Sequence, residues 1–170
     1  MKTFRTEINI EKSGNAVKHG NKSLLLGSCF ASSIGKKLEE AKHNCLVNPF
    51  GTIFNPFSIS NSLKTLIDPD NFDYNSVLFQ WEDKWYSWFH GNDFYDKNKN
   101  SLKKSIKADI NEAGKFLKKA DFLFLTFGTS WIYEEISKKM IVSNCHKVPQ
   151  NYFTKRRMSV NDIVDLLSVT

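Results

Sequence analysis

The feature that most constrains the fold is a short apolar run that ends at a glycine and leads directly into an amphipathic pattern. Ser23–Leu26 has the length and composition of a buried strand, and Gly27 supplies a turn after it. Apolar residues then recur at three- and four-residue spacing between Ala31 and Ala41, which places one apolar stripe on a helix. The segment predicts a strand, a tight turn and a helix in succession.

The same alternation of strand and helix patterns continues along the chain. Residues 45–47 predict a second strand that stops at Asn48-Pro49, and a helix pattern follows until Asp68-Pro69 ends it. A long helical pattern over residues 102–120 precedes an apolar run, Phe122–Thr126, which we expect to be a central parallel strand. Strands and helices alternating in this way predict an α/β fold with a parallel sheet covered on both faces.

Two further segments predict antiparallel hairpins. Residues 77–89 hold most of the tryptophans around a polar centre, and residues 131–143 flank a polar turn at 137–139. A two-stranded ribbon must bury one face, so we favour packing for the aromatic residues, with stacking on a sugar as the alternative. Ser159 and Asp162 have the spacing of a helix-starting capping box, which predicts a last helix.

Composition and cysteine spacing exclude several classes of protein. No apolar run approaches the roughly 20 residues of a membrane-spanning helix, so we expect no membrane association. Met1–Ile10 is charged and lacks the apolar core of a secretory signal, which predicts a cytoplasmic location. Cys29, Cys45 and Cys145 have the spacing of neither a disulfide framework nor a zinc site, so we expect no metal.

The net charge of +6 and the pI near 9.2 raise the question of nucleic-acid binding. The lysines are spread over predicted helix surfaces, where solvated charge is the ordinary outcome. We therefore expect no nucleic-acid partner. No feature of the sequence specifies an oligomeric state.

Three glycine-bearing or asparagine-bearing loops follow predicted strands: residues 27–30, 48–55 and 128–131. Ligands of parallel sheets lie at the carboxyl ends of the strands, where these loops are expected to meet. A nucleophile that follows a strand and starts a helix gains from free backbone N–H groups and from the helix dipole, and Ser28 and Cys29 have this place. The structural alternative is that Ser28 only caps the helix and Cys29 packs as a small apolar residue.

Several segments resemble one known family. Gly27-Ser28-Cys29-Phe30-Ala31 spells the name motif of the GSCFA family, which is grouped with the SGNH (GDSL-like) hydrolases. Similar segments are residues 48–52 with 55–56, residues 126–131 and residues 144–149, so the resemblance covers nearly the whole chain. It implies a three-layer, flavodoxin-like α/β fold, with residues 1–170 as the N-terminal part of a single GSCFA/SGNH-like domain. The aromatic pattern of residues 77–89 predicts that this hairpin is an insertion in the domain.

The resemblance also implies roles for individual residues. Cys29 stands where SGNH enzymes have the nucleophilic serine, and Ser28 takes that place if the register slips by one. Gly51 resembles the backbone donor to the oxyanion, and Ser130 stands where an asparagine side chain would be the other donor. The implied oxyanion and substrate-binding residues are Gly27, Asn48, Gly51, Gly128, Thr129, Ser130 and His146. Cysteine attacks acyl carbons as a thiolate, so the replacement of serine is compatible with nucleophilic catalysis.

One expected block is absent. SGNH enzymes place Asp-x-x-His near the C-terminus with histidine as the general base, and this sequence holds no Asp-x-x-His. We therefore expect a domain that is incomplete at its C-terminus, with the base beyond residue 170. For His146 we favour local hydrogen bonding or a place in the substrate pocket over a role as substitute base. His19, His43 and His90 are expected to face solvent.

The function implied is hydrolysis or transfer of an acyl group carried on an oxygen ester, as in an esterase or an O-acyltransferase. The substrate would be a small molecule or a glycan ester, and no organic cofactor is implied, because a nucleophile, a base and proton donors suffice. The alternative is a catalytically inactive domain that binds a ligand or a glycan, which the missing Asp-x-x-His block favours.

Overall fold

The centre of the fold is a sheet of three parallel strands. The computed structural model describes residues 8–11 and 13–170, and it places β1 (Lys22–Gly27) between β2 (Asn44–Val47) and β6 (Phe122–Thr126). Leu24 and Leu26 on one face of β1 are completely buried, and Leu25 on the other face is 1% exposed, as expected of a middle strand whose two faces are both covered. The prediction of a parallel sheet is confirmed.

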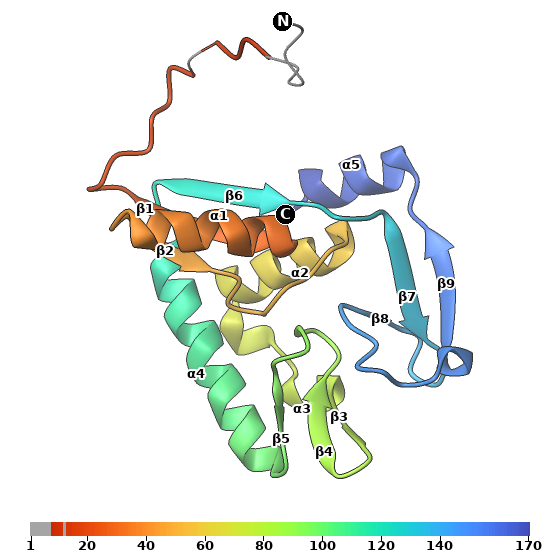
Figure 1. Cartoon of the computed structure of the whole chain (residues 1–170). Helices are drawn as coiled ribbons and strands as arrows, with labels where there is room; N and C mark the ends of the chain where they lie inside the picture. The colour runs from red at the N-terminus through yellow and green to blue at the C-terminus, as the bar shows by residue number, and fades with distance from the viewer. Residues whose placement is uncertain (1–7, 12) are drawn as a thin grey trace, which may run out of the picture.

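Helices cover both faces of this sheet (Figure 1). Helix α1 (Cys29–Glu40) packs on the face of Leu25. Helices α2 (Pro56–Ile67) and α4 (Lys99–Leu117) share a core cluster with Leu24 and Leu26. Alternate residues of a strand point to opposite faces, so the helices form two separate layers. The three-layer α/β fold is therefore as predicted, and the order β2-β1-β6 matches the first three strands of the flavodoxin-like order 2-1-3.

The helices begin where local side-chain chemistry predicts. Ser28 caps α1, and Asn55 accepts the Ser58 N–H at 2.8 Å ahead of Pro56, which starts α2. Ser159 and Asp162 form the predicted reciprocal capping box at the start of α5 (Val160–Ser168).

Two small antiparallel sheets lie outside the parallel sheet, the first between α2 and α4 in the sequence and the second after β6. One joins β3 (Leu78–Trp81), β4 (Lys84–Ser87) and β5 (Tyr95–Asp96), and the other has the order β8-β7-β9, from β7 (Trp131–Glu135), β8 (Met140–Val142) and β9 (Phe153–Arg157). Both hairpins are where the sequence predicts them. β5 and β9 were not predicted. Short helical turns complete the chain: η1 (Pro69–Asn71), α3 (Tyr74–Val77) and η2 (Gln150–Tyr152).

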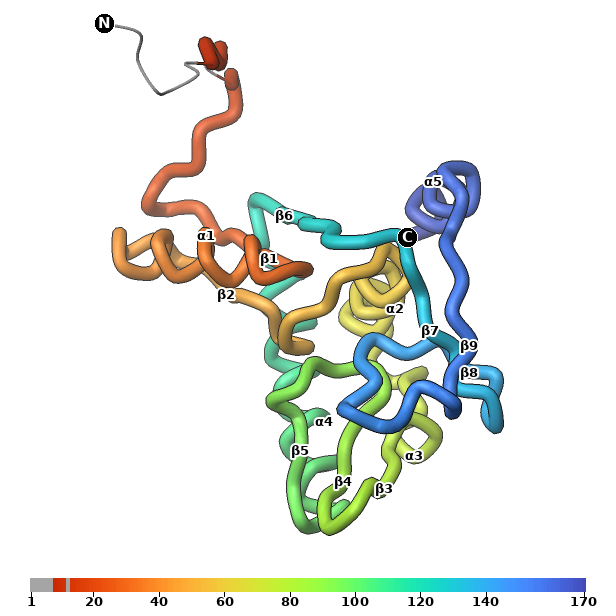
Figure 2. Tube along the Cα trace, turned by 45° about the vertical axis from the view of Figure 1, so that its right-hand side comes forward, coloured from red at the N-terminus to blue at the C-terminus, as the bar shows by residue number. Residues whose placement is uncertain are grey.

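The prediction that Phe122–Thr126 is a central strand is wrong for the described residues. β6 pairs only with β1, and its outer edge has no strand partner within residues 8–11 and 13–170. Leu123 and Phe124, which point to opposite faces, are 44% and 36% exposed. A groove of about 340 Å³ lies beside this strand and is lined by residues of α2, α4 and α5. Figure 2 shows α2 and α5 near the carboxyl end of β6. The apolar composition of β6 predicted burial on both sides, but no strand of the described residues pairs with its outer edge.

The sequence predicts neither a membrane-spanning helix nor a metal site, and the structure can be compared with both expectations. Among the described helices, none has the length and apolar character needed to cross a bilayer. Nor do His, Cys, Asp or Glu side chains gather in threes around a common point anywhere in residues 8–11 and 13–170. Met1–Glu7, on which most of the prediction of a cytoplasmic location depends, lie outside the described residues.

Candidate active site

The candidate site lies at the carboxyl edge of the parallel sheet, where the chain changes direction. The connection from β1 through α1 leads to β2 on one side of β1, and the later connection through α4 leads to β6 on the other side. The loops after β1 and β6 therefore diverge from a topological switch point, which is where α/β sheets of this kind bind ligands. Gly27–Phe30 and Gly128–Trp131 are these two loops.

Gly27 and Asn48 hold two of the turns together. Gly27 has a φ of 135°, its N–H donates to the Asn48 side-chain oxygen at 2.8 Å, and its carbonyl accepts the Ile53 N–H at 3.0 Å. The Asn48 amide nitrogen then donates to Ser32 Oγ on α1 at 2.8 Å. Asn48 thus connects the end of β2, the turn after β1 and helix α1, which makes it a positioning residue for the turn.

The backbone and the side chain of Ser28 both form hydrogen bonds that stabilise the same turn. Its N–H donates to the carbonyl and to Oγ1 of Thr126, both at 3.0 Å, and its hydroxyl lies 3.1 Å from Thr126 Oγ1. The hydroxyl also accepts the Phe30 N–H at 3.3 Å as the cap of α1. Ser28 is only 6% exposed. A hydroxyl with these partners and so little exposure is poorly placed to attack a ligand from solution.

Cys29 differs from Ser28 in exposure and in its surroundings. It is exposed and is the first residue of α1, a position where the helix offers its N–H no acceptor and where the helix dipole favours negative charge. The other two thiols are partly buried. Burial, followed by the charge of Glu39, raises the pKa of Cys45, and burial raises the pKa of Cys145 to about 11. Cys29 is therefore the accessible thiol of the chain.

The backbone donors expected for an oxyanion are engaged elsewhere. The N–H of Gly51 donates to the Asn48 carbonyl at 2.7 Å, and those of Gly128 and Thr129 donate to the Phe54 carbonyl at 2.8 and 3.2 Å. In this structure these amides stabilise the loops, and a role for the Gly51 N–H in binding an oxyanion requires its present bond to break. The sequence motif identifies the loops but does not reveal which atoms pair within them.

Ser130 lies on the loop that approaches Ser28. A Cβ built on Gly128 would be 3.5 Å from the Ser28 Cβ, so the start of this loop is in contact with the turn after β1. The Ser130 carbonyl accepts the Met158 N–H at 2.9 Å, which fixes the backbone, while its half-buried side chain forms no hydrogen bond with any described residue. The Ser130 hydroxyl is therefore free to donate to a ligand.

His146 is not part of this turn. It is 3% exposed, its Nε2 lies 2.8 Å from the Ser87 carbonyl, and its ring packs against Phe79 and Tyr86 of the aromatic hairpin. Burial lowers its pKa to about 4, although its backbone hydrogen-bond partners at Ser87 and His90 oppose the shift. Of the two predicted roles for His146, local hydrogen bonding is the one that these contacts support.

The prediction that His90 faces solvent is wrong. His90 is completely buried, stacks on Phe50 at 5.0 Å and has its Nδ1 2.7 Å from Ser87 Oγ. Burial, followed by the proximity of His146, lowers its pKa to about 3. His19 and His43 stack on each other at 4.3 Å beside the amino ends of β1 and β2, the opposite edge of the sheet from Cys29. No histidine of this chain therefore belongs to the turn of Cys29.

Comparison with known proteins adds one finding. No curated protein and no solved structure gives a significant match to this chain. A family model, by contrast, matches residues 22–170, from the first residue of β1 to the end of the chain, and therefore includes all three loops of the candidate site. The chain belongs to the GSCFA family, which indicates a hydrolase-like domain.

Proposed function

We propose that this domain performs acyl transfer, with the Cys29 thiol as the nucleophile and an oxygen ester of a small molecule or glycan as the substrate. The observation that carries the proposal is the position of Cys29: an exposed thiol at the first residue of α1, directly after the middle strand and at the switch point of the sheet. The SGNH hydrolases, which the GSCFA motif resembles, have their nucleophile at the corresponding position.

The contacts of the turn favour Cys29 over Ser28 as the nucleophile. The Ser28 hydroxyl caps α1 and pairs with Thr126, so its use in catalysis would disrupt both interactions. Cys29 forms no side-chain hydrogen bond with any described residue and lies one position further into the helix. Sulfur is also the stronger nucleophile when no adjacent base activates a hydroxyl.

In the proposed reaction the Cys29 sulfur, as a thiolate, attacks the carbonyl carbon of the ester. The carbonyl electron pair moves to oxygen, and the resulting oxyanion is stabilised by the Cys29 N–H, by the positive end of α1 and by the Ser130 hydroxyl. Collapse of this intermediate expels the alcohol, which takes up a proton, and leaves an acyl thioester on Cys29. Attack by water regenerates the thiol and releases an acid, whereas attack by a second alcohol transfers the acyl group.

A second function has a specific observation in its favour. All four histidines are either buried in the hairpin layer or located at the opposite edge of the sheet, so the turn of Cys29 has no imidazole base. A domain that retains the loops without a base is suited to binding an acylated ligand or a glycan without turnover. Multiple turnover by the chain separates the two functions.

We expect the chain to hydrolyse p-nitrophenyl acetate over many turnovers, and Cys29→Ala to reduce the steady-state rate on the order of 10³-fold or more, because the atom that carries the acyl group is lost. The measurement is p-nitrophenol release with substrate in large excess. Release of one equivalent per chain does not count as turnover, because any accessible thiol can be acylated once.

Cys45→Ala is the matched control. It removes a half-buried thiol on β2 rather than an exposed one on α1, and it is expected to leave the rate unchanged. A rate that survives Cys29→Ala would refute the assignment of the nucleophile. A wild-type chain that releases no more than one equivalent would contradict the enzyme and support the binding domain.

A further inference from the structure

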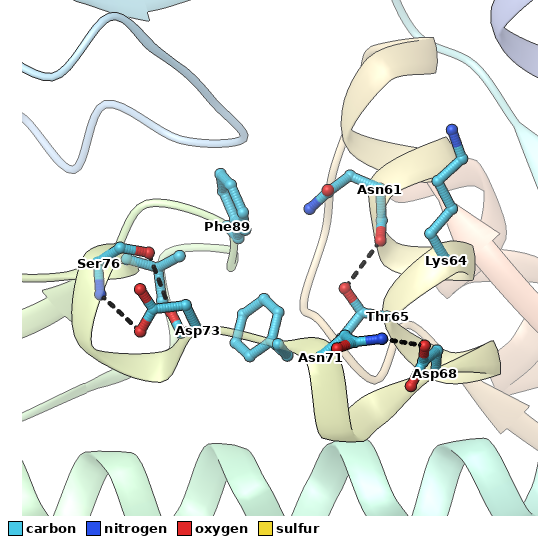
Figure 3. Close-up of a pocket in the computed structure, with 10 residues that line it drawn as sticks. Asn61, Lys64, Thr65, Asp68, Asn71, Asp73, Ser76 and Phe89 are labelled. Atoms are coloured by element: carbon cyan, nitrogen blue, oxygen red, sulfur yellow. Dashed lines mark hydrogen bonds between the residues drawn. The ribbon is translucent and has the colours of Figure 1, made fainter.

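A cavity lies between the carboxyl half of α2 and the connection that leads to the aromatic hairpin, and Cys29 is not among its lining residues (Figure 3). Its volume is about 350 Å³, near the lower end of the range for small-molecule sites. Side chains from α2, from the η1–α3 segment and from the loop after β4 converge on it. The family model covers these residues, but none of the segments described above as resembling the family lies among them.

The carboxylates of this cavity each keep hydrogen-bonding capacity. One oxygen of Asp68 accepts a hydrogen bond from the Asn71 amide. Asp73 Oδ1 accepts the N–H groups of Asn75 and Ser76 at 2.9 and 3.3 Å, and these bonds hold the pKa of Asp73 below its ordinary value. The second oxygen of Asp68 has no hydrogen-bond partner among the described residues, and the second oxygen of Asp73 accepts no backbone N–H, so both keep acceptor capacity.

An amide completes the polar side of the cavity. Thr65 Oγ1 donates to the backbone carbonyl of Asn61 at 2.9 Å, and the Asn61 side chain itself has no hydrogen-bond partner within the described part of the chain. Figure 3 shows Asn61 and Thr65 on one side of the cavity, and Asp73 and Ser76 on the other. An amide offers both a donor and an acceptor, so this side chain can pair with a ligand hydroxyl in either sense.

Two phenylalanines and Val77 form the apolar side of the cavity. The rings of Phe72 and Phe89 lie 6.1 Å apart at 52°, and both line the cavity. Phe89 is the last residue of the segment for which the sequence left sugar stacking open as an alternative. Its ring faces this cavity, whereas Trp88 beside it is 5% exposed and packs against Phe79 in the second core cluster.

We propose that this cavity binds a neutral saccharide ring. Carboxylates and amides pair with neighbouring hydroxyl groups, and an aromatic ring covers the apolar C–H face of a sugar. Two carboxylates and one ammonium, that of Lys64, line the cavity, which disfavours an anionic ligand. The proposal concerns binding only and does not depend on chemistry at Cys29.

The test is a titration of the isotope-labelled chain with methyl glycosides of glucose, galactose and N-acetylglucosamine, followed by amide chemical shifts. At least one glycoside is expected to shift the amides of Thr65, Ser76 and Phe89. Asn61→Ala should weaken this binding roughly fivefold, the value of one neutral hydrogen bond. The matched control, Asn100→Ala, removes an exposed asparagine on α4 and should leave the affinity unchanged.

Two outcomes would overturn the proposal. No shift of these amides with any of the three glycosides contradicts a saccharide site, and shifts produced by calcium chloride but not by the sugars reassign the carboxylates to a cation. Cys29→Ala is expected to bind the glycoside with the affinity of the wild type. A loss of turnover with unchanged binding therefore separates the two proposals, because each can fail without the other.

Discussion

Gly27→Ala is expected to destabilise the protein by about 3 to 5 kcal/mol, the sum of backbone strain and overpacking. Gly27 has a φ of 135°, which disfavours any residue with a Cβ. A Cβ at this position would lie 2.1 Å from the Thr126 carbonyl oxygen and 2.7 Å from Thr126 Oγ1. The Thr126 atoms in turn accept the Ser28 N–H, so moving them disrupts the contact between β1 and β6. Urea unfolding measures the loss.

Gly20→Ala is the matched control for this substitution. No atom lies within 4 Å of the Cβ position at Gly20, which precedes β1 in an exposed segment, so the unfolding midpoint should change little. If Gly27→Ala unfolded at the same urea concentration as the wild type, the turn after β1 would not have the tight geometry on which the candidate site depends.

The second large effect is a loss of stability in mild acid, caused by His90 and His146. Their pKa values in the folded chain, about 3 and about 4, lie below the ordinary 6.5. Above pH 6.5 both imidazoles are mostly neutral in the folded and in the unfolded chain, so their titration does not reduce the free energy of unfolding. As the pH falls below 6.5, the unfolded chain takes up two protons that the folded chain does not bind, so stability decreases until the folded pKa values are reached. At pH 5 each histidine accounts for about 2 kcal/mol, or about 4 kcal/mol together.

The measurement is the free energy of unfolding at pH 7.5 and at pH 5.0, a range that stays above the titration of most carboxylates. His19→Gln is the control, because His19 is exposed and its replacement should leave the difference between the two pH values unchanged. Equal stability at both pH values would contradict the burial of the two imidazoles against Ser87.

Much of the fold could be predicted from local sequence patterns. The run before Gly27 and the stripe after it define β1 and α1, and the box of Ser159 and Asp162 defines the start of α5. β9 could not be predicted, because Phe153–Arg157 has four exposed residues out of five and no apolar alternation. Its pairing with β7 depends on tertiary contacts.

The sequence predicted which loops form the candidate site, but not which atoms of these loops are already hydrogen-bonded. Glycine and asparagine after apolar runs identify the turns, and parallel strands bring these turns to one edge. Which amides are already paired depends on three-dimensional packing, as the Gly51 N–H illustrates. The burial of His90 could not be predicted either, because Phe50, on which its ring stacks, comes from a distant segment of the sequence.

If Cys29 carries the acyl group, the acyl-enzyme should be detectable by mass spectrometry of the acid-quenched steady state with p-nitrophenyl acetate. We expect a chain heavier by one acetyl group, located on the peptide that contains Cys29, and we expect this group to disappear as the substrate is exhausted. An acetyl group found on Cys45 or Cys145 instead, or one on Cys29 that persists after the substrate is gone, would contradict catalysis at this turn.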